Sequence, residues 1–353
     1  MVRDKYASRP KIRYILSFIS VALILTWLVA CSPTRGHAKA LKTEVTPVAA
    51  FHVENNRFTS FDGAKLGLTV WAAEGTEDPE YVVVGVHGMN DYAEAFEYAG
   101  PYWAARGVTT YAYDQRGFGR SESRGRWPKE ELMREDLRTA VRLAREKHPD
   151  AVLSVVGISM GAAVTMTAFG SDNPPANVDR VILSGPGLRG WGGLPFSHRA
   201  SLWASSKVRP AWIVVPPKFA VRKITPSDNY DMLVRRGRDE LNLFDNRIDQ
   251  VYGVVSVMEN GHKAAGRLPE NTLMLYGAKD DIIPENFMRR TAPTLTPHVR
   301  TAYYENGYHM LMRDLQHETV LADQLAFMKD AESALPSGAP PIPWAAESSQ
   351  ISN

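Results

Sequence analysis

Cysteine is almost absent from the sequence, and neither sign of charge is in excess. Cys31 is the only cysteine among 353 residues, so the chain cannot form an internal disulfide. Lysine and arginine total 41 against 39 acidic residues, and beyond the N-terminus the basic residues are scattered. Because a nucleic-acid-binding domain needs a concentrated basic surface, we exclude nucleic acid as a partner.

Long apolar runs are also scarce, apart from one near the N-terminus. The opening "MVRDKYASRPKIR" is rich in basic residues and precedes "YILSFISVALILTWLVA", a run whose length is close to the short limit of a transmembrane anchor. A basic segment followed by an apolar one is typical of a signal peptide. Residues 28–31, "LVAC", resemble the lipobox of bacterial lipoproteins. We therefore predict a lipoprotein signal peptide over residues 1–30, with a simple membrane anchor as the alternative.

The lipobox resemblance implies cleavage before Cys31 and attachment of lipid to this cysteine. A diacylglycerol and an acyl chain together hold a protein on a membrane more firmly than one acyl chain does. Ser32 rather than aspartate follows the cysteine, which in such lipoproteins favours the outer membrane. We expect a lipid-anchored protein of the bacterial cell envelope, with residues 31–50 as a polar tether and the Pro- and Ser-rich residues 336–353 as a disordered tail.

Beyond the tether, short apolar runs alternate with amphipathic segments. The residues on both sides of Asp62 and Gly63 alternate between apolar and polar, which predicts a β-hairpin. Helical spacing such as that of residues 129–148 lies between several further strand-like runs, namely "YVVVGVHG", "TTYAYDQRG", "LSVVGIS", "RVILSGP", "NTLMLYGAKDD" and "RTAYYENGYH". We predict an α/β fold whose mostly parallel sheet carries helices on both faces, with a core formed by residues 51–186 and 266–335.

The alternation breaks over residues 187–265, an interval longer than one crossover connection requires. Amphipathic helical spacing is mixed there with Trp, Pro and Val, which predicts a small helical cap. Ligands of open α/β sheets bind beyond the carboxyl ends of the strands, so we expect the cap to wall a substrate pocket. A peripheral subdomain that only adds stability is the alternative.

The stretch "VVGISMGAA" places Ser159 between two glycines, directly after a predicted buried strand and before a predicted helix. In isolation the motif fits an ordinary turn equally well, but strand, sharp turn and helix together are the setting of a nucleophilic serine. Gly157 and Gly161 leave no side chain to clash, so Ser159 can adopt a strained conformation that lifts its oxygen clear of the backbone.

A serine hydroxyl is a weak nucleophile and needs a base, together with a group that orients the base. The chain order serine, acid, histidine places the last two after late strands. His309 follows the final predicted strand, and Asp280 and Asp281 follow the strand before it. Neighbouring side chains at a strand end point in opposite directions, so the residue chemistry leaves open which aspartate faces His309.

An oxyanion formed during attack needs two backbone donors, one directly after the nucleophile and one after an early strand. Met160 supplies the first N–H. In "GVHGMND" the strand ends at His87 and Gly88 allows the backbone to turn, so Met89 can supply the second. Without the Ser159 motif, a plain turn would explain His87 and Gly88.

Residues 58–330 resemble the α/β-hydrolase fold, and more closely its branch of monoacylglycerol lipases and lysophospholipases, often described as serine aminopeptidase-like. "VHGMND" is similar to the oxyanion loop of this branch, "YAYDQRGFGRSE" to its Asp-x-Arg-Gly-x-Gly-x-Ser segment, "GISMGA" to its nucleophile turn and "GYHML" to its histidine loop. Its acid motif, Gly-x-x-Asp-x-x-x-Pro, matches "GAKDDIIP" with Asp280 rather than Asp281. The resemblance also implies that Asp114 and Arg116 are scaffold residues.

The oxyanion loop departs from the branch, which commonly has His-Gly-x-Gly-Glu-His where this chain has His-Gly-Met-Asn-Asp-Tyr. Asparagine tolerates a positive φ better than most residues, so we expect Asn90 to preserve the shape of the loop. Because the loop adjoins the expected substrate pocket, its different sequence leaves open which acyl chain or headgroup the pocket prefers.

The resemblance implies acyl transfer without a metal or a cofactor. Ser159 would attack an ester carbonyl, His309 would carry the proton to the leaving alcohol, and Asp280 would fix the imidazole tautomer. The expected substrates are monoacylglycerols, lysophospholipids or related lipid esters, and the N-terminal lipid anchor would hold the protein at the membrane beside them. A peptidase or amidase of the same fold and a non-catalytic envelope-binding lipoprotein are the alternatives.

Overall fold

The computed structural model of the protein describes residues 48–214 and 224–345. The predicted signal peptide, the predicted lipidation site Cys31 and most of the predicted tether lie outside these ranges. Among the described residues, no helix combines the length and the apolar character that crossing a bilayer requires.

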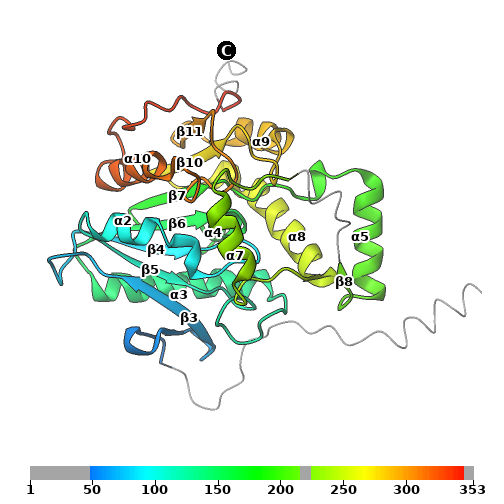
Figure 1. The fold of residues 1–353 in the computed structure, drawn as a ribbon, viewed down its shortest axis with the longest axis horizontal. Helices are drawn as coiled ribbons and strands as arrows, with labels where there is room; N and C mark the ends of the chain where they lie inside the picture. Colours follow the sequence, from blue (N-terminus) through cyan, green and yellow to red (C-terminus); the bar gives the residue numbers. More distant parts are fainter. Residues whose placement is uncertain (1–47, 215–223, 346–353) are drawn as a thin grey trace, which may run out of the picture.

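Within the described residues, one nine-stranded sheet forms the centre of the molecule (Figure 1), in the order β1-β2-β3-β5-β4-β6-β7-β10-β11. Antiparallel pairing joins β1 to β2, β2 to β3 and β3 to β5, and from β5 to β11 every pair is parallel. The strands are β1 Ala50–His52, β2 Arg57–Thr59, β3 Lys65–Trp71, β4 Tyr81–Val86, β5 Val108–Tyr113, β6 Val152–Ile158, β7 Arg180–Ser184, β10 Thr272–Gly277 and β11 Arg300–Tyr304. The six strand-like runs of the sequence are therefore all strands of the parallel part.

Helices cover both faces of this sheet, which confirms the predicted α/β-hydrolase architecture. The core helices are α2 Ala99–Ala104, α3 Glu130–Lys147, α4 Met160–Phe169, α9 Glu285–Thr291 and α10 His317–Lys329, with short 3-10 turns η1 Val53–Asn55, η2 Ala93–Phe96, η4 Ala265–Arg267 and η5 Ala292–Thr294. Val82 and Val84 of β4 share one apolar cluster with residues of α3 and α4, whereas Val83 packs with residues of α2 and α10. Alternate side chains of a strand point to opposite faces of the sheet. A strand that is covered on both faces is therefore apolar along its whole sequence.

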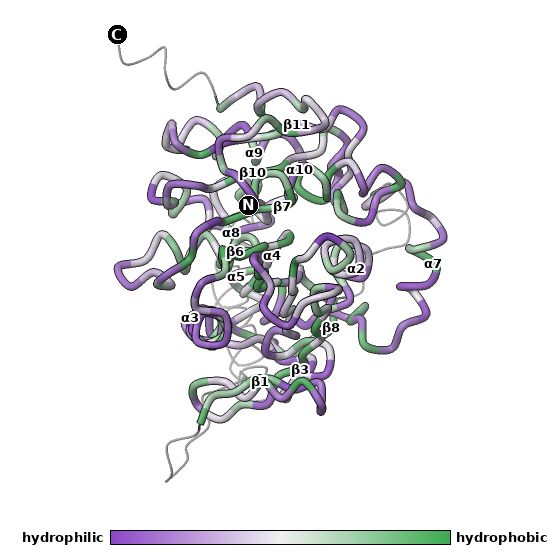
Figure 2. The backbone as a smooth tube through the Cα atoms, turned by 90° about the vertical axis from the view of Figure 1, so that its left-hand side faces the viewer, coloured by the Kyte–Doolittle hydropathy of each residue, from purple (hydrophilic) through white to green (hydrophobic). Residues whose placement is uncertain are grey.

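The two helices that flank β6 in the chain differ in their surroundings. In α3, acidic residues occupy the first turn and basic residues the last, which favours the helix dipole, and its outer side is hydrophilic (Figure 2). Every residue of α4 is buried, since this helix lies between the sheet and the cap helix α8. Small residues such as Gly161, Ala162 and Ala163 allow that close packing.

The predicted hairpin is present as β2 and β3, which pair antiparallel with Thr59 opposite Lys65. Gly63 in the turn has φ +83°, a left-handed conformation that glycine adopts without steric cost.

The segment between β7 and β10 forms a separate layer beyond the carboxyl ends of the parallel strands (Figure 1). It contains η3 Trp191–Gly193, α5 Phe196–Val208, β8 Ile213–Val214, α7 Tyr230–Arg238, β9 Asn246–Arg247 and α8 Ile248–Ala264. The strands β8 and β9 pair antiparallel, so the cap holds a two-stranded element that the prediction of a helical cap omitted. We refer to residues 187–265 as the cap.

The C-terminal segment corrects one prediction. The sequence predicts disorder over residues 336–353, yet residues 336–345 pack against the core. Ile342 and Trp344 are buried, the N–H of Tyr303 in β11 donates to the carbonyl of Pro340, and the N–H of Ile342 donates to Thr301 Oγ1. The prediction failed because it rested on the proline and serine content of the segment. It gave too little weight to Ile342 and Trp344, two apolar residues that reach the edge of the sheet. Residues 346–353 lie outside the described ranges.

Candidate active site

Ser159 occupies a sharp turn between β6 and α4, with φ +53° and ψ −117°. A positive φ is strained for a residue with a side chain, and glycine neighbours make it sterically possible. A Cβ atom at Gly161 would lie 2.1 Å from the carbonyl oxygen of Val86, and one at Gly157 would lie 2.7 Å from Cα of Ala162. Both glycines are therefore required by close backbone contacts, as the sequence predicts.

The structure brings Ser159, His309 and Asp280 into one hydrogen-bonded chain. The Ser159 hydroxyl lies 2.9 Å from Nε2 of His309, and Nδ1 of His309 lies 2.7 Å from Oδ2 of Asp280. All three residues are buried, so the imidazole is held largely out of water. In this geometry Nδ1–H donates to the carboxylate, and Nε2 is free to accept the hydroxyl proton.

Asp280, rather than Asp281, is the acid that faces His309. Its second oxygen, Oδ1, accepts the N–H groups of Ile282 and Ile283 at 2.9 and 2.8 Å, which fixes the orientation of the carboxylate. Asp281 is turned toward the cap, where its Oδ2 accepts from the N–H of Thr225 at 3.4 Å. The residue chemistry left open which aspartate faces His309, and the family motif favoured Asp280. This geometry agrees with the family motif.

The two predicted oxyanion donors lie on segments that border Ser159. Met160 is the first residue of α4, where N–H groups have no carbonyl partner within the helix. Met89 follows Gly88, at which an added Cβ would lie only 3.1 Å from Cβ of Ser159, so the loop passes directly beside Ser159. The side chains of both methionines belong to one apolar cluster together with Phe118 and other residues.

His87 supports this loop through hydrogen bonds with Gly88 and Gln115 rather than with Ser159, His309 or Asp280. Its Nδ1–H donates to the carbonyl of Gly88 at 2.7 Å, and its Nε2 accepts the N–H of Gln115 at 2.8 Å. Complete burial lowers the pKa of His87, which keeps the ring neutral with the proton on Nδ1. The Gln115 side chain in turn donates to the carbonyl of His87, so the oxyanion loop is tied to the end of β5.

Asn90 has φ +63°, a left-handed conformation that asparagine tolerates better than most residues, as expected for this position. Its carbonyl accepts the N–H of Leu243 at 3.1 Å and an N–H of Arg236 at 3.3 Å. Both partners belong to the cap, so the cap is joined to the oxyanion loop by hydrogen bonds.

A buried ion pair links the oxyanion loop to the histidine loop. Arg313, four residues after His309, donates to the two carboxylate oxygens of Asp91 at 3.0 and 3.4 Å. Burial alone would raise the pKa of Asp91, but the charges of Arg313 and Arg236 outweigh it and hold the pKa below its usual value. The sequence reasoning missed this pair, although an acid in one predicted loop and a base in the other were signals that could have revealed it.

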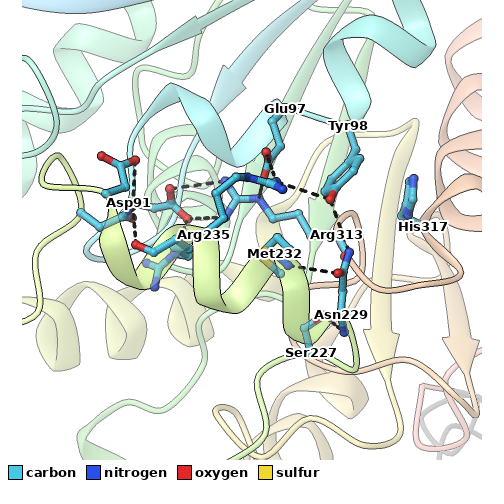
Figure 3. A network of polar contacts seen from close by, with 12 residues as sticks. Asp91, Glu97, Tyr98, Ser227, Asn229, Met232, Arg235, Arg313 and His317 are labelled. Carbon is cyan, nitrogen blue, oxygen red and sulfur yellow. Dashed lines mark hydrogen bonds and ion pairs between the residues drawn. The ribbon is translucent and has the colours of Figure 1, made fainter.

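The cap helix α7 and the residues before it hold the histidine loop from outside (Figure 3). The carbonyl of Pro226 accepts the N–H of Met310, Ser227 donates to Asp314 at 2.7 Å, and Asn229 donates to the carbonyl of Arg313 at 3.0 Å. Arg235 of α7 pairs with Glu97, whose other oxygen lies 3.6 Å from Arg313. The cap thus contacts both loops that border Ser159.

The segment with Asp114 and Arg116 has a scaffold role, as the resemblance implies. Arg116 is buried and pairs with Asp62 of the β2–β3 turn and with Asp136 of α3. Asp114 pairs with Arg120 and accepts the N–H of Ala93.

His148 and His262 make contacts that do not involve Ser159. His148 lies 2.9 Å from the Tyr111 hydroxyl, and His262 lies 2.9 Å from Thr291 Oγ1. In the part of the chain that the structure describes, no cluster of three or more His, Cys, Asp or Glu side chains could hold a metal ion.

Comparison with known proteins agrees with this architecture. A family model described as "Serine aminopeptidase, S33" of the Hydrolase_4 type matches residues 77–316. A monoacylglycerol lipase of Mycolicibacterium smegmatis is 25% identical over 276 residues, which span 75% of this chain and 93% of that protein.

Solved structures support the same fold at lower identity. A soluble variant of monoglyceride lipase from Saccharomyces cerevisiae superimposes with a TM-score of 0.64 at 19% identity, covering 84% of this chain and 100% of that one. A monoacylglycerol lipase of Paleococcus ferrophilus gives a TM-score of 0.61 at 21% identity, covering 74% of this chain and 98% of that one. Since the family model spans more than half of the chain, the protein belongs to the serine aminopeptidase S33 family of α/β-hydrolases.

Proposed function

We propose that the protein is a serine hydrolase that cleaves carboxylic esters of lipids of the monoacylglycerol or lysophospholipid type. The observation that carries the proposal is the chain of hydrogen bonds from Ser159 through His309 to Asp280. Such a chain has a specific chemical use, because it removes the hydroxyl proton at the moment of attack.

In the first step the Ser159 oxygen attacks the ester carbonyl while its proton passes to Nε2 of His309. The imidazolium that forms is stabilised by Asp280, which accepts Nδ1–H. His309 then gives the proton to the leaving alcohol as the tetrahedral intermediate collapses to an acyl-enzyme. A water molecule, deprotonated by the same imidazole, releases the fatty acid and restores the serine.

The negative oxygen of each tetrahedral intermediate would be bound by the N–H groups of Met89 and Met160. Removing one donor of this kind costs other enzymes about 3–4 kcal/mol of transition-state stabilisation. The hydrogen bonds of His87 support this assignment, because they brace the loop that carries Met89.

The lipid ester preference rests on relatives and on the apolar surroundings of the nucleophile. A curated relative and two fold neighbours are described as monoacylglycerol or monoglyceride lipases. Met160 is buried in a cluster with Trp127, Val164 and Val257, and Met89 packs against it, so the side chains that follow Ser159 and Gly88 are surrounded by apolar rather than charged groups.

Labelling with a fluorophosphonate probe tests the catalytic role of Ser159. The parent should label rapidly and hydrolyse a short p-nitrophenyl ester, and folded Ser159→Ala should do neither. A parent that does not react would support a non-catalytic envelope-binding protein instead. Ser201, an exposed residue of the cap helix α5, offers a matched Ser→Ala control that should leave both readouts unchanged.

Comparison of ester and amide substrates tests the reaction class. We expect turnover of monoacylglycerol or lysophospholipid, followed as released fatty acid, to exceed turnover of aminoacyl-p-nitroanilides by orders of magnitude. Faster cleavage of the amides would identify a peptidase, as the family description allows.

We also propose that Cys31 is lipidated and anchors the protein to the outer membrane of a bacterial envelope. The support is the sequence "LVAC" after a basic and an apolar segment, with Ser32 following. Incorporation of labelled palmitate into the parent chain, and its loss in Cys31→Ser, is the expected result. Recovery of an unprocessed N-terminus from purified membranes would contradict the proposal and support a simple anchor.

A further inference from the structure

The chain continues past α10 into a segment that crosses the edge of the sheet. We refer to residues 331–345 as the C-terminal strap. β11 is the last strand of the sheet, and Figure 1 shows the strap, in red, on the side of the molecule formed by β11, α9 and α10. The strap begins beyond residue 316, where the match to the family model ends. The family match therefore assigns this segment no role.

Asp323 of α10 holds the first part of the strap. This carboxylate is completely buried, and its Oδ1 accepts the N–H of Ser337 at 2.8 Å. Its Oδ2 accepts the hydroxyls of Ser337 and of Tyr304, the latter at 2.7 Å. Burial, followed by the charge of Asp323, raises the pKa of Tyr304, so the hydroxyl keeps the proton that it donates. Because a buried charge is costly without hydrogen bonds, the two donors of Ser337 stabilise Asp323 in place.

Tyr304 is the last residue of β11 and joins the two loops that carry Asp280 and His309. Its carbonyl accepts the N–H of Ala278 at 2.9 Å and the N–H of Gly307 at 3.0 Å. Asp280 lies two residues beyond Ala278, and His309 lies two residues beyond Gly307. A displacement of Tyr304 would therefore reach both members of the His309–Asp280 pair.

The far end of the strap packs beside the segment that follows Asp280. Ile342 and Trp344 are buried in one apolar cluster with Ile283. The N–H of Ile283 donates to Oδ1 of Asp280 at 2.8 Å. The guanidinium of Arg289 in α9 lies 4.2 Å from the centre of the Trp344 ring. The strap thus contacts α10 at one end and α9 at the other.

The composition of the strap favours a fixed conformation. Prolines occupy positions 336, 340, 341 and 343. The proline ring fixes φ, so less conformational entropy is lost when the strap packs against the core. Proline also lacks an N–H, so the strap ends the sheet rather than extending it as a further strand.

We propose that the C-terminal strap positions the His309–Asp280 pair for catalysis by fixing Tyr304 through Asp323. The inference rests on the proposed function, because it gives the strap a part in that reaction. Proton transfer from Ser159 needs the imidazole within hydrogen-bond reach, and small displacements of a catalytic group cost large factors in rate. A segment that only covers the edge of the sheet would affect stability and leave the turnover of the folded protein unchanged.

Removal of single hydroxyls from the full chain tests this route. Ser337→Ala and Tyr304→Phe should each lower kcat for a soluble p-nitrophenyl ester about fivefold, with KM unchanged. The double variant should lose no more than Tyr304→Phe alone, because Asp323 then has no hydroxyl through which to act on the two loops. Ser333→Ala is the matched control on the strap, since the Ser333 hydroxyl donates to backbone carbonyls near the end of α10. Circular dichroism and urea unfolding establish that each variant folds.

The low-field proton resonance of His309 Nδ1–H gives a readout that needs no turnover. This proton lies in the 2.7 Å hydrogen bond to Asp280. We expect the resonance in the parent and in Ser333→Ala, and its broadening through faster exchange with water in Ser337→Ala. A parent that shows the resonance but hydrolyses no ester would overturn the proposed function, and the resonance of the variants would still test the strap. Unchanged kcat and resonance in Ser337→Ala, an equal loss in Ser333→Ala, or single losses that multiply in the double variant would refute the inference.

Discussion

Removing the charge of Arg313 should destabilise the protein and slow the reaction, although Arg313 lies outside the Ser159–His309–Asp280 chain. Arg313 and its partner Asp91 are both about 5% exposed, and they join the histidine loop to the oxyanion loop. Arg313→Met keeps most of the side-chain volume and leaves Asp91 without its nearest cation. Breaking a buried ion pair by removing one partner costs about 3–5 kcal/mol.

The structure places the expected loss at the lower end of that range, about 3 kcal/mol at pH 7. Arg236 Nε remains 3.5 Å from Asp91, and the N–H of Tyr92 still donates to this carboxylate, so the charge keeps part of its stabilisation. Protonation of Asp91 sets an upper limit on this loss of stability, because the protonated side chain carries no buried charge. Protonating it costs about 1.4 kcal/mol for each unit by which the pH exceeds the pKa of Asp91 in the variant.

The loss should depend on pH in a direction that the pKa of Asp91 fixes. In the parent, that pKa is held below the ordinary value of 3.8, so the pair stabilises the fold above pH 3.8 and its contribution is lost as the pH falls through the lowered pKa. In Arg313→Met, burial is less opposed and raises the pKa of Asp91, so the folded variant binds a proton that the unfolded chain does not. The gap in stability between the parent and the variant should therefore narrow from pH 7 to pH 5.

Urea unfolding followed by tryptophan fluorescence measures the loss, and hydrolysis of a soluble p-nitrophenyl ester measures the effect on kcat. We expect kcat to fall about tenfold, because both loops that border Ser159 lose a shared restraint. Arg235→Met is the matched control, since Arg235 is exposed and its pair with Glu97 should contribute less than about 1 kcal/mol. A loss below about 1 kcal/mol for Arg313→Met, or a loss that grows at pH 5, would refute the reasoning.

Three further substitutions test other parts of the site and the fold. Gly161→Ala should cost about 2 kcal/mol in urea unfolding and lower kcat, because its Cβ would meet the carbonyl of Val86 at 2.1 Å and push the oxyanion loop away; normal stability would contradict this. Asp280→Asn should fold normally but lower kcat by about 10⁴ in the ester assay, since the amide favours the wrong tautomer of His309, and a tenfold effect would be too small for that role. Ile342→Ala should cost about 2–4 kcal/mol, because this side chain is fully buried in the segment beside β11, whereas a disordered tail would lose nothing.

The sequence predicts the central sheet well because the pattern of each parallel strand is local. A strand covered on both faces must be apolar along its whole length, and the run around Val82 to Val86 shows this directly. The nucleophile turn is predictable for a similar reason, since Gly157 and Gly161 mark the close backbone contacts around Ser159.

Contacts between distant segments are less accessible to sequence reasoning. The pair Asp91–Arg313 joins residues more than two hundred positions apart, and scattered charges of that kind give no periodic signal. The tail around Ile342 was missed because composition averages over residues, whereas docking needs only a few apolar side chains that reach an uncovered edge. The choice between Asp280 and Asp281 depended on direction at the end of a strand, which a family motif carried and residue chemistry alone did not.

The strained conformation of Ser159 is held by several backbone hydrogen bonds. A residue with a side chain at φ +53° costs of order 1–3 kcal/mol, and it persists only where neighbours over-determine it. Here the N–H of Ser159 donates to the carbonyl of Ser184, and the carbonyl of Ser159 accepts the N–H groups of Gly187 and Ala163. Gly187 begins the cap, so the turn that aims the hydroxyl at His309 is held partly by the segment that leads into the cap. Substitutions around Gly187 that leave the apolar core intact should thus affect the orientation of the nucleophile before they affect the global stability of the fold.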